Sequence, residues 1–176
     1  MSDAKETVAQ RALSIAGALA HADSGERAAA RRMGLEGAAV FWRLVARHGI
    51  APHEEEKWHR ITKLLALLTP ASATESMHEA GRQFGAVLAD GGDARTRLEK
   101  PALSEQRLAR LLAARGQARL DALERAVRAL ARNRPKVDVP SLAWAVLNDD
   151  ARAIARAYYA RLDRRADTAE KETTND

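Results

Sequence analysis

The sequence contains no cysteine, and only 4% of its residues are aromatic. The lack of cysteine excludes disulfide bonds, thiolate metal sites and cysteine nucleophiles. Apolar runs in the chain, such as Leu64–Leu68, are far shorter than the roughly 18 residues that predict a membrane span. The first six residues are polar and of mixed charge, so we expect no secretory signal and a location in the cytoplasm. With 46% apolar and 30% charged residues, we expect a folded globular protein.

Sequence patterns typical of enzymes are also missing. The chain has no glycine-rich phosphate loop of the Walker type, no dinucleotide fingerprint and no Gly-x-Ser-x-Gly motif. Two of its five histidines, His53 and His59, are six residues apart, which places them about 240° apart around a helix axis. Such a pair does not converge on a metal ion. We therefore expect no enzymatic activity, no metal and no cofactor.

The apolar residues recur with a period near 3.6, and no segment alternates with period two for long enough to predict a strand. This pattern predicts an all-α fold. Asp23, followed three residues later by Glu26, resembles a capping box, and Ser104 is a candidate N-cap. The predicted helices cover residues 8–19, 23–33, 41–49, 53–68, 76–89, 104–116, 120–134, 140–147 and 150–162.

A strong turn signal, Asp-Gly-Gly-Asp at positions 90–93, interrupts the chain near its middle. We interpret the segment from this turn to Pro101 as a linker. The sequence thus predicts two small helical bundles joined by a short linker, with an N-terminal bundle over residues 1–92 and a C-terminal bundle over residues 103–165. Residues 166–176 carry four acidic residues and one lysine, and we expect them to form an acidic, disordered tail.

Arginine dominates the positive charge, supplying 23 of the 29 basic residues. Between residues 104 and 136, nine basic residues face three acidic ones, a local balance of +6. On a helix, Arg125, Arg128 and Arg132 fall opposite an apolar face. The guanidinium fork suits phosphate oxygens, which indicates a phosphate-binding surface. On charge alone a second interpretation is equally open, because such arginines can form a merely solvated face.

The aromatic residues do not suggest platforms for stacking bases. Phe41, Trp42 and Trp144 lie within apolar stripes of predicted helices. We therefore expect them to belong to the core of the protein.

Several segments, taken together in order and spacing, resemble the small subunit of the type I-E CRISPR surveillance complex Cascade, the CasB family. The resemblance covers most of the chain. The segments that carry it are Gly25–Arg32 (GERAAARR), Val40–Val45 (VFWRLV), Gly85–Ala89 (GAVLA), Ser104–Leu112 (SEQRLARLL), Leu130, Val137–Leu142 (VDVPSL) and the pair Tyr158 and Tyr159.

The resemblance implies an all-helical, non-catalytic subunit of an RNA-guided DNA-binding complex in antiviral defence. In such complexes base pairing reads the sequence, and proteins contact the nucleic-acid backbone. The implied partners are the backbone and large subunits of Cascade, a second copy of the chain, guide RNA and target DNA, with no membrane. The basic surface is implied to hold the guide–target duplex and the displaced strand.

The resemblance also implies which basic residues form that surface. The positions that match the family best are Arg31, Arg32, Lys63, Arg107 and Arg115. Further candidates are Arg27, Arg110, Arg128 and Arg132. The alternative is a structural helical adaptor whose arginine faces bind acidic protein partners. A stand-alone DNA-binding regulator is less favoured, because no helix-turn-helix pair with a short glycine turn is present.

Overall fold

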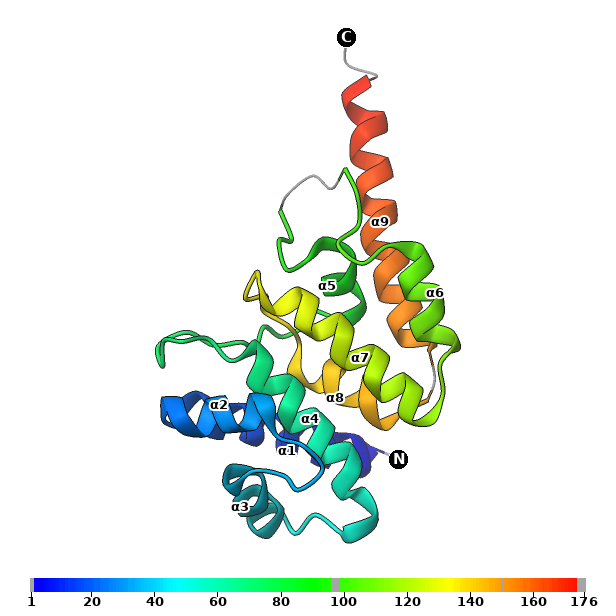
Figure 1. Ribbon diagram of the computed structural model, residues 1–176. Helices are drawn as coiled ribbons and strands as arrows, with labels where there is room; N and C mark the ends of the chain where they lie inside the picture. The colour runs from blue at the N-terminus through cyan, green and yellow to red at the C-terminus, as the bar shows by residue number, and fades with distance from the viewer. Residues whose placement is uncertain (1, 96–98, 150, 174–176) are drawn as a thin grey trace.

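The structure is a computed structural model, which describes residues 2–95, 99–149 and 151–173, with side chains from residue 8 to residue 164 within these ranges. The described residues form nine α-helices and one 3-10 helix and no strand (Figure 1), which confirms the predicted all-α fold. The helices are α1 (Ser2–His21), α2 (Ser24–Arg32), α3 (Ala39–His48), η1 (Pro52–Glu54), α4 (Glu55–Leu68), α5 (Phe84–Asp90), α6 (Glu105–Ala113), α7 (Gly116–Ala131), α8 (Val139–Leu147) and α9 (Arg152–Thr173).

Local sequence signals explain where several helices begin. The Asp23 carboxylate accepts a hydrogen bond from the backbone N–H of Glu26 at 2.8 Å, and the Ser104 hydroxyl accepts one from the N–H of Arg107 at 3.4 Å. Both side chains satisfy a donor that the first helical turn leaves free. The two predicted N-caps are therefore confirmed. Local signals also explain where a helix ends. Gly49 follows α3 and adopts the left-handed conformation that commonly ends a helix.

Residues 76–83 correct the sequence-based prediction, because they do not form the first half of a helix over 76–89. α5 starts only at Phe84. The preceding segment pairs instead with a distant extended segment: Val137 donates its N–H to the carbonyl of Met77 at 2.9 Å, and Glu79 donates its N–H to the carbonyl of Val137 at 3.1 Å. These bonds pair backbone N–H and carbonyl groups that would otherwise be paired within a helix.

A smaller difference concerns Gly116. The sequence predicts a helix over residues 104–116 that ends at this glycine, but α6 ends at Ala113 and Gly116 is the first residue of α7. The two helices therefore meet at a tight corner formed by residues 114–115.

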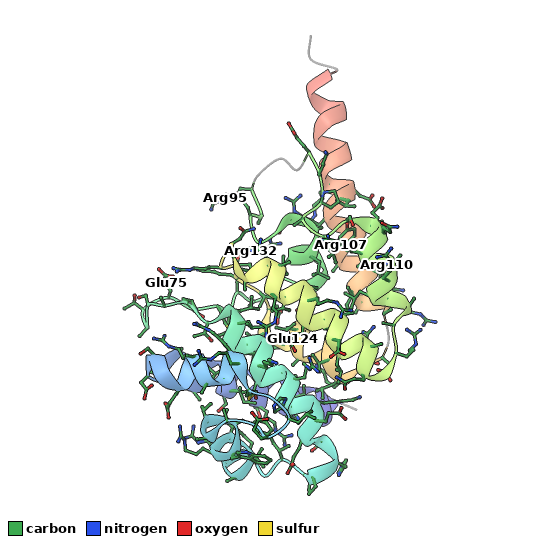
Figure 2. All side chains as sticks on the ribbon, viewed as in Figure 1. Glu75, Arg95, Arg107, Arg110, Glu124 and Arg132 are labelled. Carbon is green, nitrogen blue, oxygen red and sulfur yellow. The ribbon has the colours of Figure 1, made fainter. Side chains whose placement is uncertain are left out.

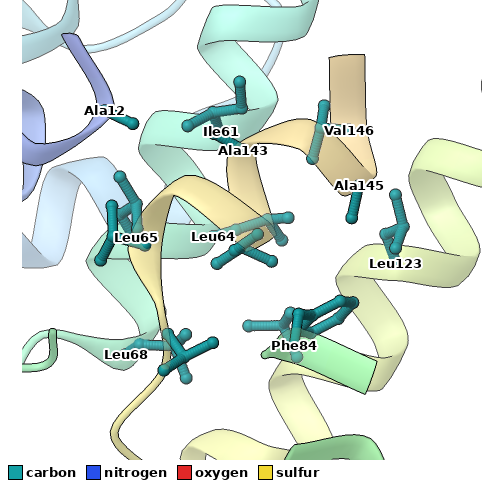
Figure 3. Packing of buried hydrophobic residues seen from close by; sticks show 14 of the residues in the cluster. Ala12, Ile61, Leu64, Leu65, Leu68, Phe84, Leu123, Ala143, Ala145 and Val146 are labelled. Carbon is teal, nitrogen blue, oxygen red and sulfur yellow. The ribbon is translucent and has the colours of Figure 1, made fainter. Parts of the chain in front are cut away.

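The buried apolar residues form one cluster that draws on most of the helices. Figure 3 shows part of it, with Ala12 of α1, Leu64 of α4, Phe84 of α5 and Leu123 of α7 packed near α8. Each fully buried leucine or phenylalanine contributes about 1.5–3 kcal/mol of burial free energy. α1 packs on α8 and α4 packs on both α7 and α8, so the helices on either side of the predicted linker share this core. The division into bundles at residues 1–92 and 103–165 stays a prediction.

α5 is buried along its whole length and lies against α9. At Gly85 the two helices approach so closely that an added Cβ would lie 2.2 Å from the carbonyl oxygen of Ile154. The position therefore requires glycine. α9 continues as far as Thr173, and the predicted disorder of residues 166–176 stays a prediction.

Candidate functional site

Two of the arginines that the resemblance selects bind backbone carbonyls of their own chain. Arg31 of α2 donates to the carbonyls of Ala66 at 2.8 Å and Thr69 at 3.1 Å. Arg27, one turn earlier, donates to the carbonyls of Pro70 and Ala71, both at 3.2 Å. The last carbonyls of a helix have no partner within the helix and carry partial negative charge. These two arginines therefore stabilise the C-terminal end of α4 and join it to α2.

Replacing Arg31 with alanine is expected to lower the free energy of unfolding by about 2 kcal/mol, because carbonyl groups in a half-buried place lose a charged donor. Urea unfolding followed by circular dichroism measures this change. The neighbouring Arg32 is exposed and has no hydrogen-bond or ion-pair partner among the described residues, so Arg32→Ala is the matched control, expected to stay within about 0.5 kcal/mol of the wild type. Equal effects of the two substitutions would contradict the role given to Arg31.

Two further candidates, Lys63 and Arg128, form ion pairs with one carboxylate. Glu124 of α7 accepts hydrogen bonds from Lys63 at 3.1 Å and from Arg128 at 2.8 Å, and it also pairs with Arg60. Arg60 reaches Asp121 as well, at 3.1 Å. Burial raises the pKa of Glu124, but the hydrogen bonds from Arg128 and Lys63 and the charges of Lys63 and Arg60 outweigh it and hold the pKa below its usual value. Glu124 therefore stays ionised and neutralises part of the basic surface between α4 and α7.

Arg115 lies at the corner between α6 and α7. One of its terminal nitrogens donates to the carbonyls of Leu112 and Ala114, both at 2.8 Å. These bonds close the exposed C-terminal end of α6. Arg132, at the end of α7, is exposed and has no hydrogen-bond or ion-pair partner in the described part of the chain.

A different environment surrounds Arg107 and Arg110 of α6 and Arg125 of α7. Together they line a cavity of about 410 Å³ between these two helices. All three side chains are exposed, and no residue with a described side chain pairs with them. Figure 2 shows Arg107 and Arg110 side by side on α6, with Arg132 near the far end of α7. The structure thus brings together two residues of the predicted set and adds a third, Arg125, that the set did not include.

The remainder of the cavity wall is apolar. Leu103, Leu111 and Ala126 are buried beneath it, while Ala122 and Ala129 line its side along α7. Three cations that have no counter-ion among the described side chains surround an apolar floor, and such an arrangement suits an anionic group attached to an apolar body. This arrangement is the strongest candidate functional site in the described part of the molecule.

The aromatic residues agree only in part with the prediction that they belong to the core. Phe41 is buried at 1% exposure, but Trp42 is 46% exposed, so for Trp42 the prediction is wrong. Its indole N–H donates to the carbonyl of Glu36 at 2.9 Å, and its ring lies 5.1 Å from that of Phe41. The tryptophan therefore covers the loop before α3 from the outside. Trp144 is half-buried.

Within the described ranges, no three histidine or acidic residues are grouped closely enough to hold a metal ion. None of the helices described is both long enough and apolar enough to cross a lipid bilayer.

Comparison with known proteins gives one match. A family model described as CRISPR-associated protein Cse2 matches residues 26–165, which is well over half of the chain and includes the whole arginine-lined cavity. No curated protein and no solved structure shows significant similarity to the chain.

Proposed function

The chain belongs to the Cse2 family, the small subunits of the type I-E CRISPR complex Cascade, and we propose that it holds nucleic acid in that complex through Arg107, Arg110 and Arg125. These arginines lie between α6 and α7 and have no partner among the described side chains. In this proposal it is a non-catalytic subunit of an RNA-guided complex in antiviral defence. Its partners are the backbone and large subunits, a second copy of itself, the guide RNA and the target DNA. Base pairing reads the sequence, and this subunit contacts the backbone.

The observation that carries the proposal is the contrast between two groups of cations. Arg31, Lys63 and Arg128 already have acceptors within the chain. Arg107, Arg110 and Arg125 share one cavity and have none among the described residues. The positive charges of the guanidinium groups that share the cavity repel one another, and a bound anion reduces this repulsion. A phosphate relieves that repulsion and accepts paired hydrogen bonds from a guanidinium group.

The proposed mechanism is electrostatic. The arginines neutralise phosphates of the displaced strand and of the guide–target duplex, and bound counter-ions are released. A displaced strand held in this way is less available to pair again with the target strand, so the opened state of the DNA lasts longer. Because phosphates are the same at every position, the contact does not depend on base sequence.

The alternative is a structural adaptor that binds carboxylates of an acidic protein partner. It is supported by the arginine–carboxylate pairs within this chain, such as Arg60 with Asp121 and Arg43 with Glu26. An adaptor would bind its partner with the same arginines but would show no affinity for free nucleic acid. The two functions therefore differ in one direct measurement.

That measurement is the fluorescence anisotropy of a labelled single strand, and of a duplex of equal length, titrated with the purified chain at salt concentrations from about 50 to 300 mM. Three phosphate contacts predict a log–log slope of about −2 for the single strand, hence a loss of affinity of about 40-fold over this range. Binding that depends on salt but not on base sequence supports the proposal. No binding at the lowest salt favours the adaptor.

A further inference from the structure

The cavity between α6 and α7 has two chemically distinct parts. Its rim carries the guanidinium groups of Arg107, Arg110 and Arg125. Its floor and side consist of leucine and alanine, and the lining includes no hydroxyl, amide or carboxylate side chain. A site for phosphates alone would not need an apolar hollow. The hollow indicates that a second, uncharged part of the ligand enters it.

The floor is held rigidly before any ligand arrives. The N–H of Leu103 donates to the carbonyl of Leu88 at 2.9 Å, and the carbonyl of Leu103 accepts from the hydroxyl of Tyr158 at 2.6 Å. Burial raises the pKa of Tyr158 to about 12, so the hydroxyl keeps its proton and remains a donor. Leu103 is thus fixed to both α5 and α9. A preformed hollow costs little ordering free energy when it is filled.

We propose that this cavity is a subsite for one unpaired nucleotide of the held strand, whose base enters the apolar hollow while its neighbouring phosphates lie on the three arginines. The inference rests on the proposed function and adds that the base of the nucleotide occupies the apolar hollow. The volume of about 410 Å³ lies within the range of about 300–1,000 Å³ typical of small-ligand sites. Guanidinium planes stack well on bases, so the rim and the floor can both contact the same nucleotide.

Two properties follow from this geometry. A base paired in a duplex is stacked and cannot enter, so the site distinguishes single strands from duplex. The apolar lining cannot recognise the polar edge of a particular base, so every base is accepted. Part of the affinity then comes from the base and does not vary with salt, in contrast to the phosphate contacts.

The first test compares two labelled strands with the same number of phosphates: oligothymidine and an abasic strand of equal length. Their binding to the full chain is measured by anisotropy over the same range of salt. We expect the abasic strand to bind about fivefold more weakly, with an unchanged salt slope. Equal affinity of the two strands would overturn the inference while leaving the proposed function intact. Failure of both strands to bind would instead remove the proposed function.

The second test locates the subsite. Ala129 lies on the exposed side of the cavity, so Ala129→Leu narrows the hollow without altering charge or helix propensity by much. Ala109→Leu on the outer side of α6 is the matched control, because Ala109 is exposed and does not line the cavity. We expect the Ala129 variant to lose the roughly fivefold preference for oligothymidine over the abasic strand, and the Ala109 variant to keep it. A preference retained in this variant would place the base elsewhere and overturn the inference.

Discussion

Replacing both Arg107 and Arg125 with glutamate is expected to weaken the binding of a single strand about 30-fold at 100 mM salt. The two residues lie on different helices and face one cavity, so the substitution changes both walls of the site. Each lost phosphate contact removes about 0.7 of the log–log salt slope for a single strand, and the new carboxylates add repulsion. The magnitude of the negative salt slope is therefore expected to decrease by at least about 1.4. Anisotropy titrations at several salt concentrations measure both quantities.

The matched control is the replacement of Arg47 and Arg156 with glutamate. Both are exposed, have no hydrogen-bond or ion-pair partner among the described residues and do not line the cavity. The two double variants have the same net charge, so a general electrostatic attraction would be reduced equally in both. We expect a much smaller loss of affinity in the control. Equal losses would show that the charge of the whole molecule, and not the cavity, determines binding.

Replacing Asp90 with alanine is expected to lower the free energy of unfolding by about 3–5 kcal/mol. The Asp90 side chain is 0% exposed and accepts hydrogen bonds from Arg82 and from Arg161, the latter at 2.8 Å. It also accepts one from the N–H of Gly92 at 3.0 Å. Without the carboxylate, two largely buried guanidinium groups lose their shared counter-ion. Leaving buried charges without this counter-ion lowers the free energy of unfolding by more than the intact ion pairs add to it. The end of α5 would also lose its connection to α9.

Urea unfolding of Asp90→Ala and of Glu75→Ala gives the comparison. Glu75 is an exposed carboxylate on the loop after α4, labelled in Figure 2, and its removal is expected to change stability by less than about 0.5 kcal/mol. Both variants lose one negative charge, so the comparison separates the buried contact from net charge. A change of less than about 1 kcal/mol in the Asp90 variant would contradict the role of the buried carboxylate.

Much of the fold could be predicted from the sequence because most of its determinants are local. Residues only a few positions apart determine the helix caps at Asp23 and Ser104. The same holds for the apolar face of α7. Residues 76–83 were predicted wrongly for the opposite reason. Their hydrogen-bond partner, Val137, lies about sixty residues away, and no local pattern indicates that pairing.

The site could be predicted only in part, because an arginine's availability depends on what the fold places beside it. Arg107 and Arg110 were selected from the sequence and lie at the cavity. The same resemblance also selected Arg31 and Lys63, but their acceptors come from α4 and from Glu124 of α7, which are distant in sequence. Arg125 was seen on the basic face of its helix, yet only the packing of α7 against α6 makes it part of one site. The part that each of these residues has in binding nucleic acid stays a prediction.

The central claim is that Arg107, Arg110 and Arg125, which no described side chain pairs with, hold nucleic acid within the assembled complex. Its most direct test is the rate at which labelled target DNA leaves reconstituted Cascade that contains either the Arg107/Arg125 double glutamate variant or the Arg47/Arg156 control. Assembly of each complex is checked first by size-exclusion chromatography. We predict release about 10-fold faster or more from the complex with the Arg107/Arg125 variant. Equal release rates from the two complexes would contradict the claim.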